Sequence, residues 1–366
     1  MFATTTCVRG GDRAVARALG VAVALATVLG AIAPAHGCDL CAIYTTTESR
    51  EDQTGPYVGV GEQFSYFHTL QEGGVEVPNP NGERISSSIT QFVMGYNVEP
   101  RIALQINLPL INRDFRRLTR DGIQNGDVFG VGDMSLLGLV KPWSYVDLDR
   151  VAHVVGFAGI KFPTGSTSFL AEEAAPPCIP FPDPNQCSPQ SARLQLGVPL
   201  PPRLQAHHMI GVPSGVHGHD LTLGSGSYDG IVGAQLFGSW KRAFAAASVQ
   251  YLIRSTGAYG YEFANDLLWA GGPGVYVLTG DSLFDAPYTL RVQALLTGES
   301  KGNDSLNGKT EGDTAITALY LGPMFAFAWS THLNSEIGID FPMLQNNSGL
   351  QIVPEYRARG GVTWRF

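Results

Sequence analysis

Apolar residues recur at every second position along much of this chain. The pattern is clearest in three stretches, residues 102–110, 333–343 and 356–366. In each stretch the intervening positions are polar, charged or small. A period of two is typical of β-strands, because successive side chains point to opposite faces. The chain is therefore predicted to be all-β, with strands that have one apolar and one polar face.

The composition supports this prediction and limits the alternatives. Only 15% of the residues are charged, and 44 Gly and 23 Pro would interrupt helices, whereas soluble domains carry about 25% charged residues. The mean hydropathy of +0.03 is too low for a bundle of transmembrane helices. An aromatic content of 10% is too high for a disordered chain.

The alternating segments favour a transmembrane barrel over a soluble β-sandwich. Many of them exceed ten residues, whereas strands in soluble domains are most often about five or six residues long. The chain also ends in Val-Thr-Trp-Arg-Phe, which resembles the assembly signal of bacterial outer-membrane proteins. In such a barrel the apolar face contacts lipid and the polar face lines the lumen. We therefore expect a closed antiparallel transmembrane β-barrel, with a soluble sandwich as the alternative.

We expect about twelve strands, an even number as in bacterial barrels, and one long extracellular loop. The predicted strands are 56–71, 84–98, 101–115, 129–145, 150–163, 226–240, 243–257, 265–280, 286–299, 313–329, 332–344 and 352–366. Short turns are expected at 99–100, 146–149, 241–242, 281–285 and 330–331. Longer connections are expected at 72–83, 116–128, 164–225, 258–264, 300–312 and 345–351. Both barrel ends then lie on the short-turn side, which predicts periplasmic N- and C-termini.

The first 37 residues have the features of a secretory signal peptide. Three arginines precede an uninterrupted apolar run at 18–33, and small residues follow up to Cys38. The run is shorter than the roughly 20 residues of a membrane-spanning helix. We predict a signal peptide at 1–37, a periplasmic segment at 38–54 and an outer-membrane barrel at 55–366. Lipidation of Cys38 is the alternative at this junction.

Export as a barrel implies the bacterial outer membrane and a specific set of partners. We expect contact with outer-membrane lipid, and recognition by the barrel-assembly machinery through Phe366. The net charge of −8 gives no indication of nucleic-acid binding. No cofactor is expected.

Three short motifs resemble the meta-pathway phenol-degradation (MetA-like) family of outer-membrane transporters. They are Gly130-Val-Gly-Asp133, Lys161-Phe-Pro-Thr-Gly165 and Leu223-Gly-Ser-Gly-Ser-Tyr-Asp229, in the order expected for that family. The resemblance covers roughly residues 55–366 and implies an outer-membrane channel or porin-like role. The chain departs from the family in its long 164–225 loop with Cys and His residues. The resemblance implies no catalytic residues.

Four cysteines follow the predicted signal peptide. Cys178 and Cys187 lie nine residues apart in the longest loop, a spacing that predicts a disulfide in an oxidising compartment. Cys38 and Cys41 form a Cys-x-x-Cys pair, for which a local disulfide is one interpretation. A redox dithiol, a soft-metal site or contact with a periplasmic redox partner are the others.

Four histidines fall within thirteen residues of the long loop: His207, His208, His217 and His219. Imidazoles at this density are candidate ligands for Zn, Cu or Ni. The intervening Gly and Pro residues indicate a loop, not a helix that presents ligands at fixed spacing. We therefore expect a solvated extracellular loop, with a metal site as the alternative.

The polar face of the strands supplies candidate pore-lining residues. They are Gln105, Asn107, Lys161, Arg254, Arg291, Glu336, Asp340, Arg357, Arg359 and Arg365. Opposed rows of acidic and basic side chains would create a transverse field that orients a dipolar solute. Alternatively, these charges neutralise one another and fill a narrow lumen. Glu62 has the parity of the apolar face, so we expect a bulge or an interfacial position there.

Three functions are compatible with a barrel of this kind. The leading hypothesis is a channel that passes small solutes, such as aromatic or other apolar compounds, through a narrow charged lumen. The second is a structural or partner-docking barrel whose Cys-x-x-Cys segment contacts a periplasmic redox or metal protein. The third is an outer-membrane hydrolase, which we do not expect, because His68, His153 and His332 are scattered outside any hydrolase motif.

Overall fold

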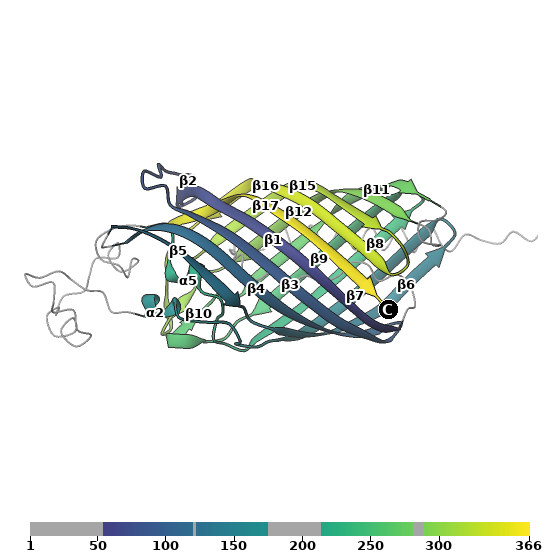
Figure 1. Cartoon of the computed structure of the whole chain (residues 1–366), viewed down its shortest axis with the longest axis horizontal. Coiled ribbons are helices and arrows are strands. Elements are labelled where there is room, and N and C mark those ends of the chain that lie inside the picture. The colour runs from purple at the N-terminus through teal and green to yellow at the C-terminus, as the bar shows by residue number, and fades with distance from the viewer. Residues whose placement is uncertain (1–53, 120–121, 175–213, 281–287) are drawn as a thin grey trace, which may run out of the picture. The chain divides into compact units, whose positions relative to one another are not determined.

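The computed structural model describes residues 54–119, 122–174, 214–280 and 288–366. Within these residues, twelve strands form one closed antiparallel barrel, as the alternation predicted (Figure 1). In chain order they are β1 (Gly55–Glu72), β3 (Arg84–Glu99), β4 (Ile102–Thr119), β6 (Ser135–Asp147), β7 (Arg150–Lys161), β8 (Asp229–Trp240), β9 (Ala243–Ile253), β11 (Asp266–Thr279), β12 (Thr289–Lys301), β15 (Ile316–Ala328), β16 (Leu333–Asn347) and β17 (Leu350–Arg365).

The barrel is closed by the pairing of its first and last strands. β1 and β17 pair from Tyr57 opposite Arg365 to Glu72 opposite Leu350, with irregularities on both sides of Phe67. The backbone N–H of Phe366 also donates a hydrogen bond to the carbonyl of Pro56, 3.1 Å away. The described chain therefore begins and ends at the same rim, because β1 starts where β17 finishes.

The predicted faces of the strands are those that the structure shows. On β16, Ile337, Ile339 and Phe341 are exposed on the outside, while the intervening Asp340 is buried. The same division holds for other barrel strands, where exposed positions carry Val, Leu, Ile, Phe, Tyr or Trp. An apolar exterior around a polar interior is the arrangement of a barrel that lies in lipid.

Most of the short turns lie at one rim of the barrel. At the rim where the described residues begin and end, β3–β4, β6–β7, β8–β9 and β15–β16 are joined by at most four residues. At the other rim, residues 345–351, predicted as a longer connection, form mostly strand, and only Ser348 and Gly349 separate β16 from β17. Gly349 has φ = +59°, a conformation that favours glycine in so tight a turn.

The strand predicted at 129–145 is wrong in its boundaries. The chain instead forms β5 (Gly122–Val131), which pairs with residues 110–119 of β4, and then β6, which pairs with residues 102–107 of β4. Residues 116–128, predicted as a long loop, are therefore mostly β-strand. Among the described residues β5 pairs only with β4, so its second edge adjoins no barrel strand.

Smaller elements occupy the rim with the longer connections. They are β2 (Val75–Glu76), η2 (Ala258–Gly260), β10 (Tyr261–Glu262), β13 (Ser305–Leu306), β14 (Lys309–Thr310), α2 (Leu170–Glu173) and α5 (Gly218–Leu221). The helices α2 and α5 belong to residues 162–174 and 214–228 between β7 and β8, which we call the plug. Residues of the plug pack against Ile85, Phe115 and Ile352 of three barrel strands. This part of the predicted extracellular loop therefore folds against the inside of the barrel.

Glu62 is accommodated without the predicted bulge. β1 and β3 stay in register from Gly55 to Phe67. The Glu62 carboxylate accepts hydrogen bonds from Ser88 Oγ at 2.6 Å and from Thr90 Oγ1 at 2.5 Å. Two hydroxyl groups on the neighbouring strand therefore satisfy the carboxylate on the apolar face.

Several predictions fall outside the described residues. These are the signal peptide at 1–37, the segment at 38–54, His207, His208 and the cysteines at 38, 41, 178 and 187. None of the described helices has the length and hydropathy needed to cross a membrane.

The exterior of β16 gives a direct test of lipid exposure. We expect Ile339→Arg to lower the free energy of unfolding by about 2–4 kcal/mol, the cost of a cation near the bilayer midplane. Asn112→Arg is the matched control, because Asn112 is also exposed but lies in the part of β4 that pairs with β5, nearer the rim. There the cost of a cation is about 0–1 kcal/mol. Urea unfolding in phospholipid vesicles measures both. Equal costs would contradict a lipid-facing position for Ile339.

Candidate functional site

A cavity of about 260 Å³ lies in the barrel lumen. One side of its lining is aromatic and comes from β7, β8 and β9, with Phe157, Phe237 and Phe244. The rings of Phe237 and Phe244 stack with their centroids 5.9 Å apart. A ring face in this position offers dispersion and stacking contacts to a small aromatic molecule.

The other side of the cavity is charged and comes from β12, β16 and β17. Arg357 Nη1 lies 3.0 Å from Glu299 Oε2, and its Nη2 lies 3.5 Å from Asp340 Oδ2. Arg359 Nη2 contacts the same Asp340 oxygen at 2.6 Å. The Arg357 guanidinium also stacks on Tyr320, 3.5 Å from the ring centroid. Ion pairs and ring contacts thus hold these cations along one wall, because an unpaired buried charge is costly.

A second cavity of about 40 Å³ lies where the plug meets the barrel wall. Lys161 Nζ lies 2.9 Å from Asp133 and 2.8 Å from Asp229, and Arg254 Nη1 lies 2.8 Å from Asp229. The two cavities share Ile89 and Gln91 in their linings. They are therefore adjacent compartments of one lumen.

Asp133 joins the plug to the break between β5 and β6. Its Oδ1 accepts a hydrogen bond from the backbone N–H of Gly165 at 2.9 Å, and its Oδ2 accepts one from that of Ser225 at 2.9 Å. Thr164 Oγ1 donates to the carbonyl of Gly132 at 2.8 Å. We call this set, with Lys161, the latch. All three motifs of the family resemblance meet in it.

The structure places the ten predicted pore-lining residues at three locations. The larger cavity is bordered by Arg291, Glu336, Arg357 and Arg359. The smaller one is bordered by Asn107, Lys161 and Arg254. Gln105, Asp340 and Arg365 are buried but belong to neither lining. The predicted opposition of acidic and basic rows holds for Asp340 with Arg357 and Arg359, and the lining of a conducting path stays a prediction.

Sequence reasoning missed two kinds of residue in these cavities. Thr297 and Glu299 share the parity of Arg291 on β12, so the alternation could have found them. The aromatic wall carried no such signal. Around Phe157, both faces of β7 are apolar or small, so a period of two does not show which residues point inward.

The plug is held to the barrel by buried polar contacts. Arg113 Nη1 on β4 donates to the carbonyls of Asp220 at 2.6 Å and Thr222 at 2.8 Å. Glu83 Oε2, just before β3, accepts from Ser214 Oγ at 2.6 Å. Arg117 binds Glu172 of α2 through two hydrogen bonds of 2.8 and 3.0 Å. Contacts from β4 and from the residue before β3 thus hold both described parts of the plug inside the barrel rim.

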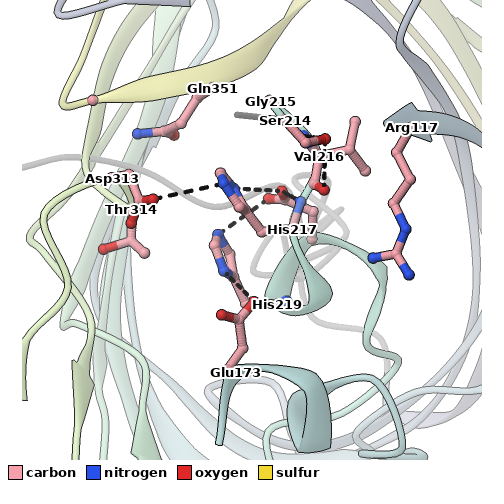
Figure 2. Close-up of polar contacts among 12 residues, drawn as sticks. Arg117, Glu173, Ser214, Gly215, Val216, His217, His219, Asp313, Thr314 and Gln351 are labelled. Atoms are coloured by element: carbon pink, nitrogen blue, oxygen red, sulfur yellow. Dashed lines mark hydrogen bonds and ion pairs between the residues drawn. The ribbon is translucent and has the colours of Figure 1, made fainter. Parts of the chain in front are cut away.

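The prediction that the loop histidines are solvated is wrong for His217 and His219. Both lie at α5 inside the ring of strands, where Figure 2 shows them between Glu173 and Asp313. His219 is buried, and the two imidazoles lie 5.2 Å apart at an interplanar angle of 15°. Carboxylate oxygens of Glu173, Asp220 and Asp313 lie 3.0 to 3.7 Å from the ring nitrogens.

The surroundings set the charge of this cluster. Burial alone would lower the pKa of His219, but the charge of Asp220 and the hydrogen bond and charge of Glu173 raise it to about 10. Burial alone would raise the pKa of Glu173, but its hydrogen bond with His219 and the charges of His219 and His217 lower it to about 2. The cluster therefore favours positive charge on the rings and negative charge around them.

The remaining described histidines do not form a common site. His68 Nδ1 lies 3.2 Å from Glu355, His153 stacks on Phe237, and His332 Nδ1 lies 2.9 Å from the Thr331 hydroxyl. These positions lie on three separate parts of the barrel.

No protein-family model and no curated protein matches this chain. A crystal structure of the COG4313 outer membrane channel from Pseudomonas putida F1 is similar, with a TM-score of 0.53 and 11% identity over 89% of this chain and 100% of that one. The β domain of the Bordetella autotransporter BrkA gives a TM-score of 0.38 at 10% identity, over 86% of this chain and 100% of that one. The CymD monoaromatic hydrocarbon channel gives 0.32 at 9%, over 86% and 89%. At this identity the first of these structures shows a shared barrel fold.

Proposed function

We propose that the protein is an outer-membrane channel for small molecules that combine an aromatic or other apolar body with a polar group. The observation that carries this proposal is the lumen cavity of about 260 Å³, with Phe157, Phe237 and Phe244 in one part of its lining and Arg357 and Glu299 in another. Arg291 lies over the Phe244 ring, 5.6 Å from its centroid, and so places a cation beside the aromatic side chains. A solute with an aromatic or apolar body and a polar group interacts favourably with the rings and with the charges at once. A sugar of the same size interacts favourably mainly with the charges.

Placement in the outer membrane is supported by the apolar exterior and by the closed wall. In lipid, every backbone N–H and C=O needs a partner within the protein, which a closed barrel provides. The protein of similar fold from Pseudomonas putida F1 is itself described as an outer membrane channel. We place the rim that carries both chain ends in the periplasm and the plug on the extracellular side, as the lengths of the connections favour.

The plug and the latch control access in this proposal. Ile89 and Gln91 border both cavities, and residues of the plug border the smaller one. A solute that enters through the smaller cavity passes the latch residues Asp133 and Lys161. Because those residues hold the plug by charged hydrogen bonds, weakening them should open the passage.

The wall chemistry predicts a preference among solutes. In liposomes that contain the protein, we expect benzenesulfonate to pass faster than arabinose, since only the sulfonate has both an aromatic ring and a charge. Phe244→Ala should reduce this preference by about 2- to 10-fold, because an aromatic contact contributes roughly 0.5–1.5 kcal/mol. Tracer efflux measures both rates, with protein-free liposomes as the background.

Phe341→Ala is the matched control for that experiment, because Phe341 is on the outside of β16 and 50% exposed. It should leave the preference unchanged. Equal passage of the two solutes, or no flux above protein-free liposomes, would overturn the proposed function.

The latch gives a second prediction. Asp133→Asn removes the negative charge that pairs with Lys161 and weakens two contacts with the plug. We therefore expect the local free energy of unfolding of the plug to fall by about 1–3 kcal/mol, the usual contribution of a charge-assisted hydrogen bond. Faster hydrogen exchange at residues 222–228 and a higher ion conductance in planar bilayers would show it. Asp147→Asn, at the other rim, should change neither. Unchanged exchange in Asp133→Asn would show that the latch does not hold the plug.

A further inference from the structure

The plug contains a cluster of metal-ligating side chains that the channel function does not use. His217, His219 and Asp220 each offer one ligand atom, and all three atoms lie within 4.8 Å of one another. Two imidazoles and one carboxylate form a donor set that suits Zn²⁺ and other divalent first-row transition metals.

Two of the distances match the spacing of ligands around one ion. His219 Nε2 lies 3.5 Å from Asp220 Oδ1, and His217 Nδ1 lies 3.7 Å from Asp220 Oδ2. Ligands about 2.0–2.1 Å from a tetrahedral zinc ion are roughly 3.3 Å apart. A shift of a few tenths of an ångström would bring these atoms to that spacing.

The outer nitrogen of each imidazole faces a further carboxylate. His219 Nδ1 lies 3.0 Å from Glu173 Oε1, and His217 Nε2 lies 3.6 Å from Asp313 Oδ2 (Figure 2). Histidines that bind metals almost always donate their other N–H to such a partner, which fixes the tautomer and strengthens the ligand. Here both histidines have one nitrogen directed to Asp220 and the other to an outer carboxylate.

The charges around the cluster also fit a cation. Nearby Glu172 forms an ion pair with Arg117, and Asp304 forms one with Lys301. In the described part of the chain, by contrast, Glu173 and Asp220 form ion pairs with histidines alone. A divalent ion between two neutral imidazoles carries the same charge as two protonated rings.

We propose that His217, His219 and Asp220 bind one divalent transition-metal ion, with Glu173 and Asp313 orienting the two imidazoles. The ion would link the turn of α5 to α2 through Glu173 and to the loop before β15 through Asp313. It would thereby add a crosslink within the plug at the extracellular rim. The site goes beyond the proposed transport function and does not depend on it.

The rings lie at 15° to each other, and a bound ion lies near the plane of each imidazole. We therefore expect binding to turn at least one ring about its Cβ–Cγ bond. Glu173 and Asp313 are close enough to keep their contacts through a small rotation of this kind.

Metal titrations of the full chain in detergent test the proposal, with the cysteines alkylated so that thiolates do not bind. Zn²⁺ binding by calorimetry should give one site per chain, and Co²⁺ should give the visible absorption of a low-coordinate nitrogen and oxygen site. Excess Mg²⁺ or Ca²⁺ should not compete, because these ions prefer oxygen ligands.

Variants then assign the ligands. His219→Gln and Asp220→Asn should each abolish measurable binding at the site. Glu173→Gln should weaken binding about 10- to 100-fold, the usual effect of losing an outer partner. His207→Gln with His208→Gln, a pair from the same loop, should leave the affinity unchanged. Heat-modifiable gel mobility confirms that each variant is folded.

A measurement on the unmodified sequence keeps the test independent of variant folding. The X-ray absorption spectrum of the Zn²⁺-loaded protein should show two imidazoles and oxygen ligation. Absence of a stoichiometric site, a sulfur-ligated or all-oxygen ion, or loss of binding in the His207 and His208 variant alone would overturn the proposal.

Discussion

A strand that crosses a bilayer has no water to satisfy its backbone, so its N–H and C=O groups must bond to neighbouring strands on both edges. The pairing of β1 with β17 joins the first of the twelve described barrel strands to the last, so that among the described strands of the wall only β5, which pairs with β4 alone, keeps an unpaired edge. Closure also divides the side chains, since every second residue then faces lipid and the others face an enclosed interior. The polar groups of that interior must therefore find partners among themselves.

The interior meets this second requirement in part with paired charges. Arg357 contacts both Asp340 and Glu299, and the three residues come from three strands. Next to the plug, Asp229 contacts both Lys161 and Arg254. Breaking such a pair leaves a buried charge without compensation, which costs several kcal/mol. The larger cavity is consequently bordered both by residues of the first network and by aromatic rings.

The strands could be predicted from the sequence because lipid and lumen impose opposite polarities on alternate residues. Residues such as 102–110 and 333–343 record that division clearly. β5 could not be found in this way. Its first half, Gly122-Ile-Gln-Asn-Gly-Asp, lies towards the rim, where the outside is exposed to water and an apolar face is not needed. The aromatic wall could not be predicted for a different reason. Both faces of β7 carry apolar or small residues around Phe157, so the alternation does not show which side chains point inward.

The plug could not be predicted because its order comes from contacts between distant segments. A stretch rich in Gly, Pro and His has the composition of a solvated loop, and contacts with distant residues such as Arg113, Glu83 and Asp133 give part of it a fixed conformation. The three resemblance motifs contained this information, since each supplies part of the latch, but separately each has the composition of an ordinary turn.

The contacts of Asp133 also explain the interruption between β5 and β6. It turns the chain so that Asp133 faces the plug, and the contacts of Asp133 with Gly165 and Ser225 join the two parts of the plug that lead to α2 and α5. Asp133, at the strand break in the barrel wall, thus connects the segments that carry Glu173 and His217.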